Sequence, residues 1–316
     1  MKVIAIDFGG TRIKIGLTED GQVIKFTMLD VIPGFSFGDS LDHIEKQIRN
    51  MLSAQELDQV VGIGISYPGL VNWKEKRVIQ GNSKHSDAVD FDISKWVWER
   101  FQLPFVLEND ANAAILGELH YGCGLGSQDA VMMILGTGVG TAAVMEGKIV
   151  RGKHFQAGCL GGHFPIGRQE RKCTCPGTDC VEAYASTWAL PKLISEHPLY
   201  RKSGLSKEKI KDFKILKKYA EAKDLVAQEI LQECILSFSK GIIALIYAYD
   251  PEIVILSGGI VNFGEDLLKP IIEYVHEHAW TPWGKVQFRV AENKEHSVLL
   301  GLHYLMRQEI DKASER

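Results

Sequence analysis

Residues 2–17 read KVIAIDFGGTRIKIGL and predict a strand, a glycine turn and a second strand. Residues 3–6 form a short apolar run, Asp7 closes it, and residues 9–11 form the turn. Two adjacent glycines followed by a hydroxyl let backbone N–H groups approach an anion closely, and a carboxylate at the strand end could organise a metal ion. A Gly-Gly pair is also an ordinary hairpin turn, so this stretch alone leaves both interpretations open.

Residues 131–145 read VMMILGTGVGTAAVM and repeat that plan of apolar strand, glycine turn with threonine, and apolar strand. The repeat indicates two related halves, each with a turn suited to phosphate. The glycine spacing also fits a dinucleotide fingerprint, but the turn leads into a strand and not a helix, which argues against a Rossmann site. A third glycine turn, residues 257–259, follows the predicted strand 253–256 and suits a flat polar ligand.

Two further strand ends carry turn or polar residues. The strand within residues 60–71 ends in Tyr67-Pro68-Gly69, and an open α/β sheet binds its ligands at such ends. The strand 105–107 runs into Glu108-Asn109-Asp110-Ala111-Asn112, followed by an alanine-rich helix. Asn109 or Asp110 could simply cap that helix, but one cap explains only one of four polar residues. A carboxylate at this junction is also a natural general base for a substrate hydroxyl.

Residues 158–182 read GCLGGHFPIGRQERKCTCPGTDCVE and contain a candidate metal site. Three cysteines in a Cys-x-Cys-x4-Cys spacing allow one small loop to wrap a tetrahedral ion, and a preceding histidine completes a Cys3His set. Ordinary reduced thiols are the plainer alternative, and a disulfide is the weaker one because the neighbouring cysteines would be strained. A closed set leaves no open position for chemistry. We therefore expect a structural Zn²⁺ at His163, Cys173, Cys175 and Cys180.

The bulk properties limit the class of protein. The 316 residues allow one large or two medium domains, and 45% hydrophobic composition is ample for a core. A net charge of −4 gives no reason to expect a nucleic-acid or membrane partner. The start of the chain lacks the features of a signal peptide, and no run of eighteen apolar residues is present. We expect a cytoplasmic protein.

Taken together, these motifs resemble those of the ROK family of sugar kinases and repressors. The resemblance covers nearly the whole chain and keeps the order of its motifs. It rests on DFGGTRIKIG, GIGISYPGLV, ENDANAAILGE, GTGVGT, the set from His163 to Cys180 followed by Glu182, and DPEIVILSGG. It implies an α/β fold, the two-lobed actin-like ATPase (ribonuclease H-like) fold with a zinc-binding loop. We expect a smaller lobe of residues 1–118 and 299–316, and a larger lobe of residues 119–298 that carries the zinc loop at 163–180.

The resemblance also implies the reaction, transfer of the γ-phosphoryl group of ATP, bound with Mg²⁺, to a sugar hydroxyl, commonly O6. Asp110 matches the catalytic base, and His163 would bind zinc through one ring nitrogen and a sugar hydroxyl through the other. The implied substrate-binding residues are Gly69, Asn109, Asp110, His163 and Glu182. The implied ATP-binding and phosphate-binding residues are Asp7, Gly9, Gly10, Thr11, Gly136, Thr137, Gly138, Gly258 and Gly259.

One departure from the family pattern concerns the sugar. The family usually has Ala-Gly-Glu-Ile/Leu-Gly-His, in which the Glu binds hydroxyls near C1 and C2. Residues 157–163 of this chain are AGCLGGH, so the Glu is absent and one residue is added. Neither Cys159 nor Leu160 can accept two hydroxyl hydrogen bonds as a carboxylate does. We therefore expect a sugar that lacks, masks or reorients those hydroxyls: a glycoside, a disaccharide, a ketose or a modified hexose.

Two alternatives to a kinase follow from the same resemblance. Repressors of the family carry a winged-helix domain ahead of the first phosphate motif, whereas here that motif starts at Lys2 and the net charge is acidic. A non-catalytic sugar sensor fits the missing Glu, but the retained Asp110 and phosphate turns argue against it. The resemblance further implies a homodimer.

Overall fold

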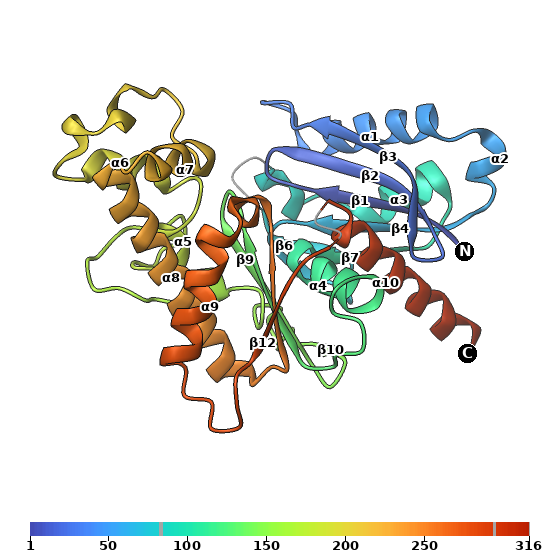
Figure 1. The fold of residues 1–316 in the computed structure, drawn as a ribbon. Coiled ribbons are helices and arrows are strands. Elements are labelled where there is room, and N and C mark those ends of the chain that lie inside the picture. The colour runs from blue at the N-terminus through green and yellow to red at the C-terminus, as the bar shows by residue number, and fades with distance from the viewer. Residues whose placement is uncertain (82–84, 293–294, 316) are drawn as a thin grey trace. The chain divides into compact units, whose positions relative to one another are not determined.

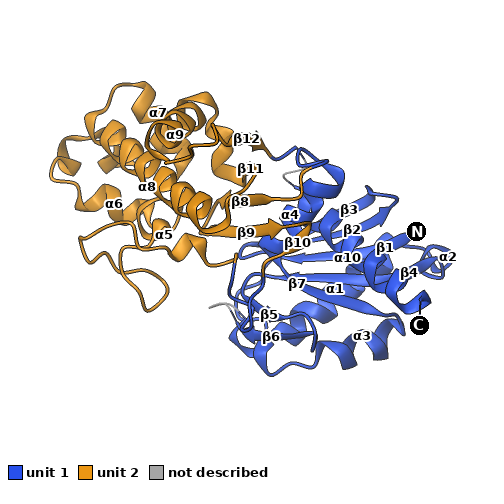
Figure 2. Cartoon of the chain, turned by 90° about the horizontal axis from the view of Figure 1, so that it is seen from below, with its two compact units in different colours: residues 1–126, 151–157, 291–316 blue, residues 127–150, 158–290 orange. Residues whose placement is uncertain are grey.

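The structure is a computed structural model that describes residues 1–81, 85–292 and 295–315. The chain forms two compact units (Figure 2). Unit 1 comprises residues 1–126, 151–157 and 291–316, and unit 2 comprises residues 127–150 and 158–290. The lobe boundaries expected from the sequence, at residues 118 and 298, stay a prediction.

Unit 1 is built on a five-stranded sheet in the order β3-β2-β1-β4-β7 (Figure 1). Its first three strands form an antiparallel meander, whereas β4 and β7 run parallel to β1. The register pairs Asp7 with Ser66, and Tyr67 with Asn109, so polar strand ends lie side by side. The strands are β1 (Lys2–Phe8), β2 (Arg12–Glu19), β3 (Gln22–Asp30), β4 (Val60–Tyr67) and β7 (Phe105–Asn109).

Helices pack on both faces of this sheet because side chains alternate along its strands. Ile4, Ile6 and Phe8 of β1 pack into one core with α1 and α3, while Ala5 packs on the other face with α4 and α10. The helices are α1 (Phe37–Met51), α2 (Ala54–Leu57), α3 (Ile93–Phe101), α4 (Asp110–Tyr121) and α10 (Ser297–Ser314). The smaller elements are the hairpin β5 (Leu70–Asn72) and β6 (Arg77–Gln80), and the 3-10 turn η1 (Ser86–Val89).

Unit 2 repeats the connectivity of unit 1, in the strand order β10-β9-β8-β11-β12. Here too a three-stranded antiparallel meander is extended by two parallel strands, β11 and β12. The two related halves indicated by the sequence are thus present as two sheets of one topology. The strands are β8 (Ala130–Leu135), β9 (Val139–Met145), β10 (Lys148–Ile149), β11 (Ile253–Ser257) and β12 (Gln287–Val290).

The core of unit 2 is centred on α8 (Leu225–Tyr249). Its apolar residues at helical spacing, Ile230, Cys234, Phe238, Ile242 and Leu245, are all buried. In the described part of the chain, α8 is also the one helix long and apolar enough to cross a membrane. Half of its apolar window is buried inside the structure, and core helices pass the same test, so this is weak evidence for a span.

The other helices of unit 2 are α5 (Val181–Tyr184), α6 (Leu190–Glu196), α7 (Phe213–Glu221) and α9 (Glu265–His278). The 3-10 turns are η2 (Gly161–His163), η3 (Tyr200–Lys202), η4 (Gly204–Lys207) and η5 (Gly259–Phe263).

Helices α4 and α10 approach so closely that two glycines are required where they cross. A Cβ on Gly117 would overlap the carbonyl oxygen of Ser297, and one on Gly301 would overlap that of Ala113. Both obstacles are backbone atoms, which cannot rotate away as a side chain can. The crossing fixes the C-terminal helix against the helix that begins at Asp110.

Gly301→Ala is expected to lower the free energy of unfolding by about 2 kcal/mol, because the added methyl group forces the two backbones apart. In an uncrowded helix the same change stabilises by up to about 1 kcal/mol. Urea unfolding followed by circular dichroism measures the difference. Gly38→Ala in α1 is the control, since its Cβ meets only the edge of the Phe91 ring, at 3.0 Å. Equal stability of Gly301→Ala and the wild type would contradict the expected crowding.

Candidate functional site

The carboxyl ends of β1 and β4 hold Asp7 in a buried polar setting. Asp7 is only 6% exposed, and the hydroxyl of Ser66 donates a hydrogen bond of 2.8 Å to its Oδ1. The ammonium of Lys14 lies 3.9 Å from Oδ2. Burial raises the pKa of Asp7, while Lys14 and Ser66 oppose that rise. A carboxylate held at a strand end in this way can bind a cation.

The turn after β1 is shaped by its glycines. The N–H of Gly9 donates to the carbonyl oxygen of Arg12 at 2.9 Å, and a Cβ on Gly9 would lie 2.6 Å from that oxygen. Gly10 and Thr11 are exposed. The turn therefore presents backbone and a hydroxyl beside Asp7, as a phosphate-binding turn does.

Asn109 is the N-cap of α4. The sequence had left either Asn109 or Asp110 as the candidate cap. Its Oδ1 accepts from the N–H of Asn112 at 3.1 Å. Its Nδ2 donates to the carbonyl oxygen of Gly69 and to Oδ1 of Asp110, both at 3.0 Å. The cap thus ties the ends of β4 and β7 together and orients the next residue, Asp110.

Asp110 is not needed as the cap, and its environment is unusual for a carboxylate. It is partly buried and accepts a hydrogen bond from the N–H of Ala111 at 2.8 Å. Burial, and next the negative charge of Asp7, raise the pKa of Asp110 to about 7. A carboxyl group whose pKa lies near neutrality is suited to exchange a proton with a substrate.

No sequence motif marks the ion pair that supports the end of β7. Glu108 is buried, and its Oε1 accepts from the N–H of Asn109 at 2.9 Å and from Nδ2 of Asn112 at 3.0 Å. Its Oε2 accepts from the guanidinium of Arg151, which lies 4.7 Å above the ring of Trp73. Glu108 could have been singled out from its polar run, but Arg151 is distant in sequence and has no motif.

In unit 2, two predicted ATP-binding turns follow neighbouring parallel strands. Residues 136–138 follow β8 and residues 258–259 follow β11, which pairs with β8 in register. The N–H of Gly136 donates to the carbonyl oxygen of Gly138 at 3.0 Å and closes the first turn. Gly258 has a φ of +91°, and a Cβ there would overlap the backbone of Leu135. Glycine is therefore required where the second turn crosses the end of β8.

Residues 187–188, which follow α5, form hydrogen bonds with the turn 136–138. The backbone N–H of Thr187 donates to the carbonyl oxygen of Gly136 at 3.1 Å, and that of Trp188 donates to the carbonyl oxygen of Thr137 at 3.2 Å. The carbonyl oxygens of Gly136 and Thr137 are thus paired with donors of the protein. An unpaired carbonyl oxygen would repel a phosphate.

Glu182 on α5 is only 8% exposed and accepts three hydrogen bonds. The N–H of Val139 donates to Oε2 at 2.8 Å. The hydroxyl of Thr174 and the indole N–H of Trp188 donate to Oε1, at 3.0 and 2.9 Å. Glu182 therefore lies between the turn 136–138 and the cysteine loop, and its three partners fix its orientation.

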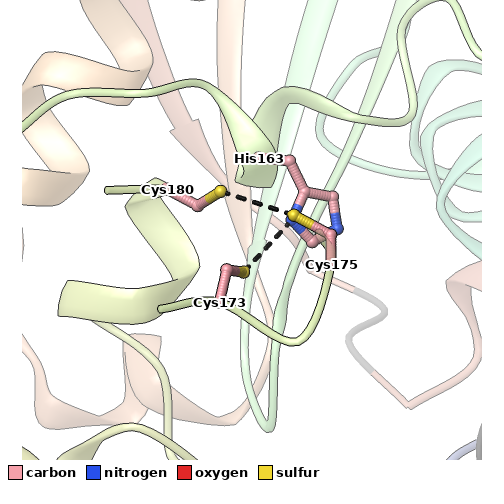
Figure 3. A group of neighbouring side chains, drawn as sticks. All are labelled: His163, Cys173, Cys175 and Cys180. Carbon is pink, nitrogen blue, oxygen red and sulfur yellow. Dashed lines mark hydrogen bonds between the residues drawn. The ribbon is translucent and has the colours of Figure 1, made fainter. Parts of the chain in front are cut away.

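The four residues expected to bind zinc converge (Figure 3). Their ligand atoms all lie within 4.8 Å of one another. Sγ of Cys173 is 3.5 Å from Nδ1 of His163, and Sγ of Cys175 is 3.6 Å from Sγ of Cys180. A tetrahedral Zn²⁺ with Zn–S bonds of about 2.3 Å requires ligand separations of roughly 3.8 Å, so the donor set fits zinc. All six cysteines lie in the described residues and are free thiols, which does not favour the disulfide alternative.

The candidate metal-binding loop, residues 163–180, is held in shape by Asp179. Its carboxylate accepts from the N–H groups of Gln169, Glu170 and Arg171 and from the hydroxyl of Tyr184. These hydrogen bonds lower the pKa of Asp179 and keep it ionised, the Tyr184 hydroxyl making the largest contribution. Burial, followed by the neighbouring thiols of Cys175 and Cys173, raises the pKa of Cys180. Such a cluster holds its thiolates most readily when a cation is among them.

The predicted site residues therefore form two groups. Unit 1 contains the residues from Asp7 to Thr11, Gly69, Asn109 and Asp110, all at the carboxyl ends of its parallel strands. Unit 2 contains the turns 136–138 and 258–259, Glu182 and the candidate metal-binding set of His163 and three cysteines. The residues that sequence reasoning missed are Ser66, Glu108, Arg151, Thr174 and Trp188.

Comparison with known proteins gives a consistent result. The ROK family pattern matches residues 3–309. The glucokinase of Thermotoga maritima is 30% identical over 286 residues, which cover 88% of either chain. The beta-glucoside kinase of Listeria monocytogenes is 29% identical over 313 residues, 98% of either chain. The xylose repressor of Bacillus subtilis is 26% identical over 71% of this chain and 55% of its own length.

A solved structure shows the same fold. The structure of a ROK family glucokinase from Streptomyces griseus, in complex with glucose and AMPPNP, covers 98% of this chain and is itself covered completely. Its TM-score is 0.76 at 26% identity. The fold class expected from the sequence, an actin-like ATPase fold, is confirmed.

Asp110→Asn is expected to raise the melting temperature at neutral pH. The folded pKa of about 7 lies above the ordinary value of 3.8, so the folded state binds the proton more tightly than the unfolded state. The stability that this proton contributes is present below pH about 4 and is lost as the pH rises through about 7. Thermal melts from pH about 5 to 8 should therefore show a difference that grows with pH and then levels off.

The surface variant Asp90→Asn is the control for that experiment and is expected to show no such pH-dependent difference. A constant difference for Asp110→Asn across the whole pH range would contradict the raised pKa.

The purified protein is expected to contain about one zinc ion per chain, and Cys175→Ser is expected to lose most of it. Removing one of four ligands weakens a closed tetrahedral set and loosens the loop, so the melting temperature should also fall. Plasma mass spectrometry and thermal melts measure the two effects. Cys123→Ser, outside the set, should keep the metal. Full zinc content in Cys175→Ser would show that the set is not the metal site.

Proposed function

Because this chain belongs to the ROK family, we propose that it is an ATP-dependent carbohydrate kinase. The substrate is a hexose or hexose derivative, and the acceptor is its O6 hydroxyl. The observation that carries the proposal is the position of Asp110 at the end of β7, oriented by the cap Asn109 and with a pKa raised to about 7. The names of the kinase relatives and of the glucokinase structure support it.

Asp110 is the general base in the proposed reaction. A base with a pKa near the working pH combines a useful ionised fraction with strong affinity for the proton. Asp110 accepts the proton of the sugar hydroxyl as the oxygen attacks the γ-phosphorus of ATP. The bond between that phosphorus and the β,γ-bridging oxygen breaks, and ADP leaves. Nearby Asp7 makes Asp110 a better proton acceptor by disfavouring a second negative charge.

The phosphate groups of ATP are bound by the glycine turns. Residues 9–11 and 136–138 supply backbone N–H groups and threonine hydroxyls, and residues 258–259 lie beside the adenosine. Mg²⁺ enters as part of the nucleotide substrate and supplies charge neutralisation, and Asp7 is the carboxylate placed to hold it. Gly69, Asn109, Asp110, His163 and Glu182 bind the sugar in this proposal.

The sugar is proposed to be one whose C1 and C2 hydroxyls need no carboxylate partner. Cys159 and Leu160, which stand where the family usually has its Glu, are partly buried on the approach to η2. A thiol and an isobutyl group favour an apolar or substituted neighbour. The beta-glucoside kinase among the relatives supports a glycoside or disaccharide as the best substrate.

A sensor that binds sugar without phosphorylating it is the second candidate, because xylose repressors also match this chain. The raised pKa of Asp110 favours the kinase, since a sensor has no need of a base poised near neutrality. A homodimer, a cytoplasmic location and the lack of nucleic-acid and membrane partners stay predictions.

The test is ADP release from ATP and Mg²⁺ with a panel of glucose, β-glucosides, disaccharides, ketoses and amino sugars. We expect sugar-dependent turnover that falls at least about 100-fold in Asp110→Asn. The kcat/KM should decrease as the pH drops below about 7, because Asp110 then becomes protonated. Asp90→Asn serves as the matched control. Folded, zinc-loaded protein with no turnover on any sugar would favour the sensor, and free glucose as the best substrate by a wide margin would refute the glycoside proposal.

A further inference from the structure

Glu182 joins the candidate metal-binding loop, residues 163–180, to the glycine turn 136–138. Thr174 lies between the ligands Cys173 and Cys175, and its hydroxyl donates to Oε1 of Glu182 at 3.0 Å. The N–H of Val139, the first residue after the turn, donates to Oε2 at 2.8 Å. Two hydrogen bonds through one carboxylate therefore connect the interior of the loop with the turn.

The carboxylate of Glu182 has little room to move. A Cβ on Gly138 would overlap Oε2 of Glu182, so the turn rests directly on the carboxylate. The indole of Trp188 donates to Oε1 at 2.9 Å, and its backbone N–H donates to the carbonyl oxygen of Thr137. A carboxylate offers about four acceptor positions, so three donors leave one, on Oε2, for a ligand. A shift of Glu182 must therefore move the turn or break a hydrogen bond.

The position of Thr174 depends in turn on the loop around it. Thr174 is exposed, and in the loop the N–H of Cys173 makes a long hydrogen bond of 3.3 Å to the carbonyl oxygen of Gly177. The two flanking thiols belong to the Cys3His set, so a bound cation would fix their positions. Without a cation these clustered sulfurs lose their common partner, and a short loop of this kind loosens. Water then competes with the Thr174 hydroxyl for the hydrogen bond to Oε1 of Glu182.

We propose that Thr174 and Glu182 form a relay through which the metal-binding loop positions the turn 136–138 and so sets the affinity for the phosphates of the nucleotide. The relay rests on the proposed function, in which this turn binds ATP. It differs from the role of His163, which acts on the sugar. Thr174 is a positioning residue because it acts through Glu182.

Nucleotide binding in the absence of sugar isolates the relay, because the contribution of His163 requires a sugar. Titration calorimetry with AMPPNP and Mg²⁺ compares wild-type protein before and after zinc removal by a chelator. We expect zinc removal to weaken binding by about threefold to tenfold, the effect of one ordinary hydrogen bond. Thr174→Val with zinc bound should show the same loss, with no further loss on chelation. Thr174→Ser keeps the hydroxyl and should behave as the wild type.

Trp188→Phe is the matched control, since it removes a donor to the same oxygen from outside the metal-binding loop. It should weaken nucleotide binding in both metal states and leave the effect of zinc in place. Zinc content and circular dichroism are measured for every sample. If chelation unfolds the protein, the comparison of zinc-loaded Thr174→Val with zinc-loaded wild type decides.

Two results would overturn the relay: zinc-loaded Thr174→Val that binds AMPPNP as tightly as the wild type, or wild-type affinity unaffected by chelation. If zinc-loaded wild type binds no nucleotide at all, the proposed function fails. The relay is then decided by amide hydrogen exchange at Val139. The relay predicts slower exchange with zinc than without it in the wild type, and no effect of zinc in Thr174→Val. Equal exchange in both metal states of the wild type would exclude the relay.

Discussion

Parallel pairing of β1, β4 and β7 is the constraint on which the candidate site of unit 1 depends. Because parallel strands end at the same edge, the register places Asp7 beside Ser66, and Tyr67 beside Asn109. Two carboxylates, Asp7 and Asp110, are thereby brought close enough that the charge of Asp7 raises the pKa of Asp110. The sheet thus brings together groups that would repel one another in water. The free energy of burying them is offset by the core on both faces.

Two buried glutamates, Glu108 in unit 1 and Glu182 in unit 2, have different kinds of hydrogen-bond donor. In unit 1, Glu108 is compensated by the guanidinium of Arg151, and it supports the backbone of the cap residue Asn109. In unit 2, Glu182 has no ion-pair partner among the described residues and is satisfied by three neutral donors. A charge held by neutral donors keeps acceptor capacity and negative potential for a ligand, whereas a charge paired with arginine is largely neutralised. This contrast agrees with a supporting role for Glu108 and a ligand-binding role for Glu182.

Much of the fold could be predicted from the sequence, because its periodicities are local. The strand-turn-strand units at residues 2–17 and 131–145 and the glycine turns all occur where the pattern placed them. Residues 201–223 are harder to predict from their sequence. They form two 3-10 turns and α7, in which Phe213 and Leu216 are buried. Charge dominates the composition there and conceals a short apolar stripe.

By itself, the sequence determined the fold family, the candidate metal-ligand set and the identity of the polar strand ends, because motifs of glycine, cysteine and carboxylate at fixed spacing have few structural solutions. Only the tertiary structure decided which groups support them. Arg151 reaches Glu108 from 43 residues away, and Trp188 and Thr174 meet on Glu182 from opposite sides along the chain. No local pattern encodes such contacts, since they depend on how strands and loops pack. The same holds for the pKa of Asp110, because burial and a neighbouring charge exist only in the folded chain.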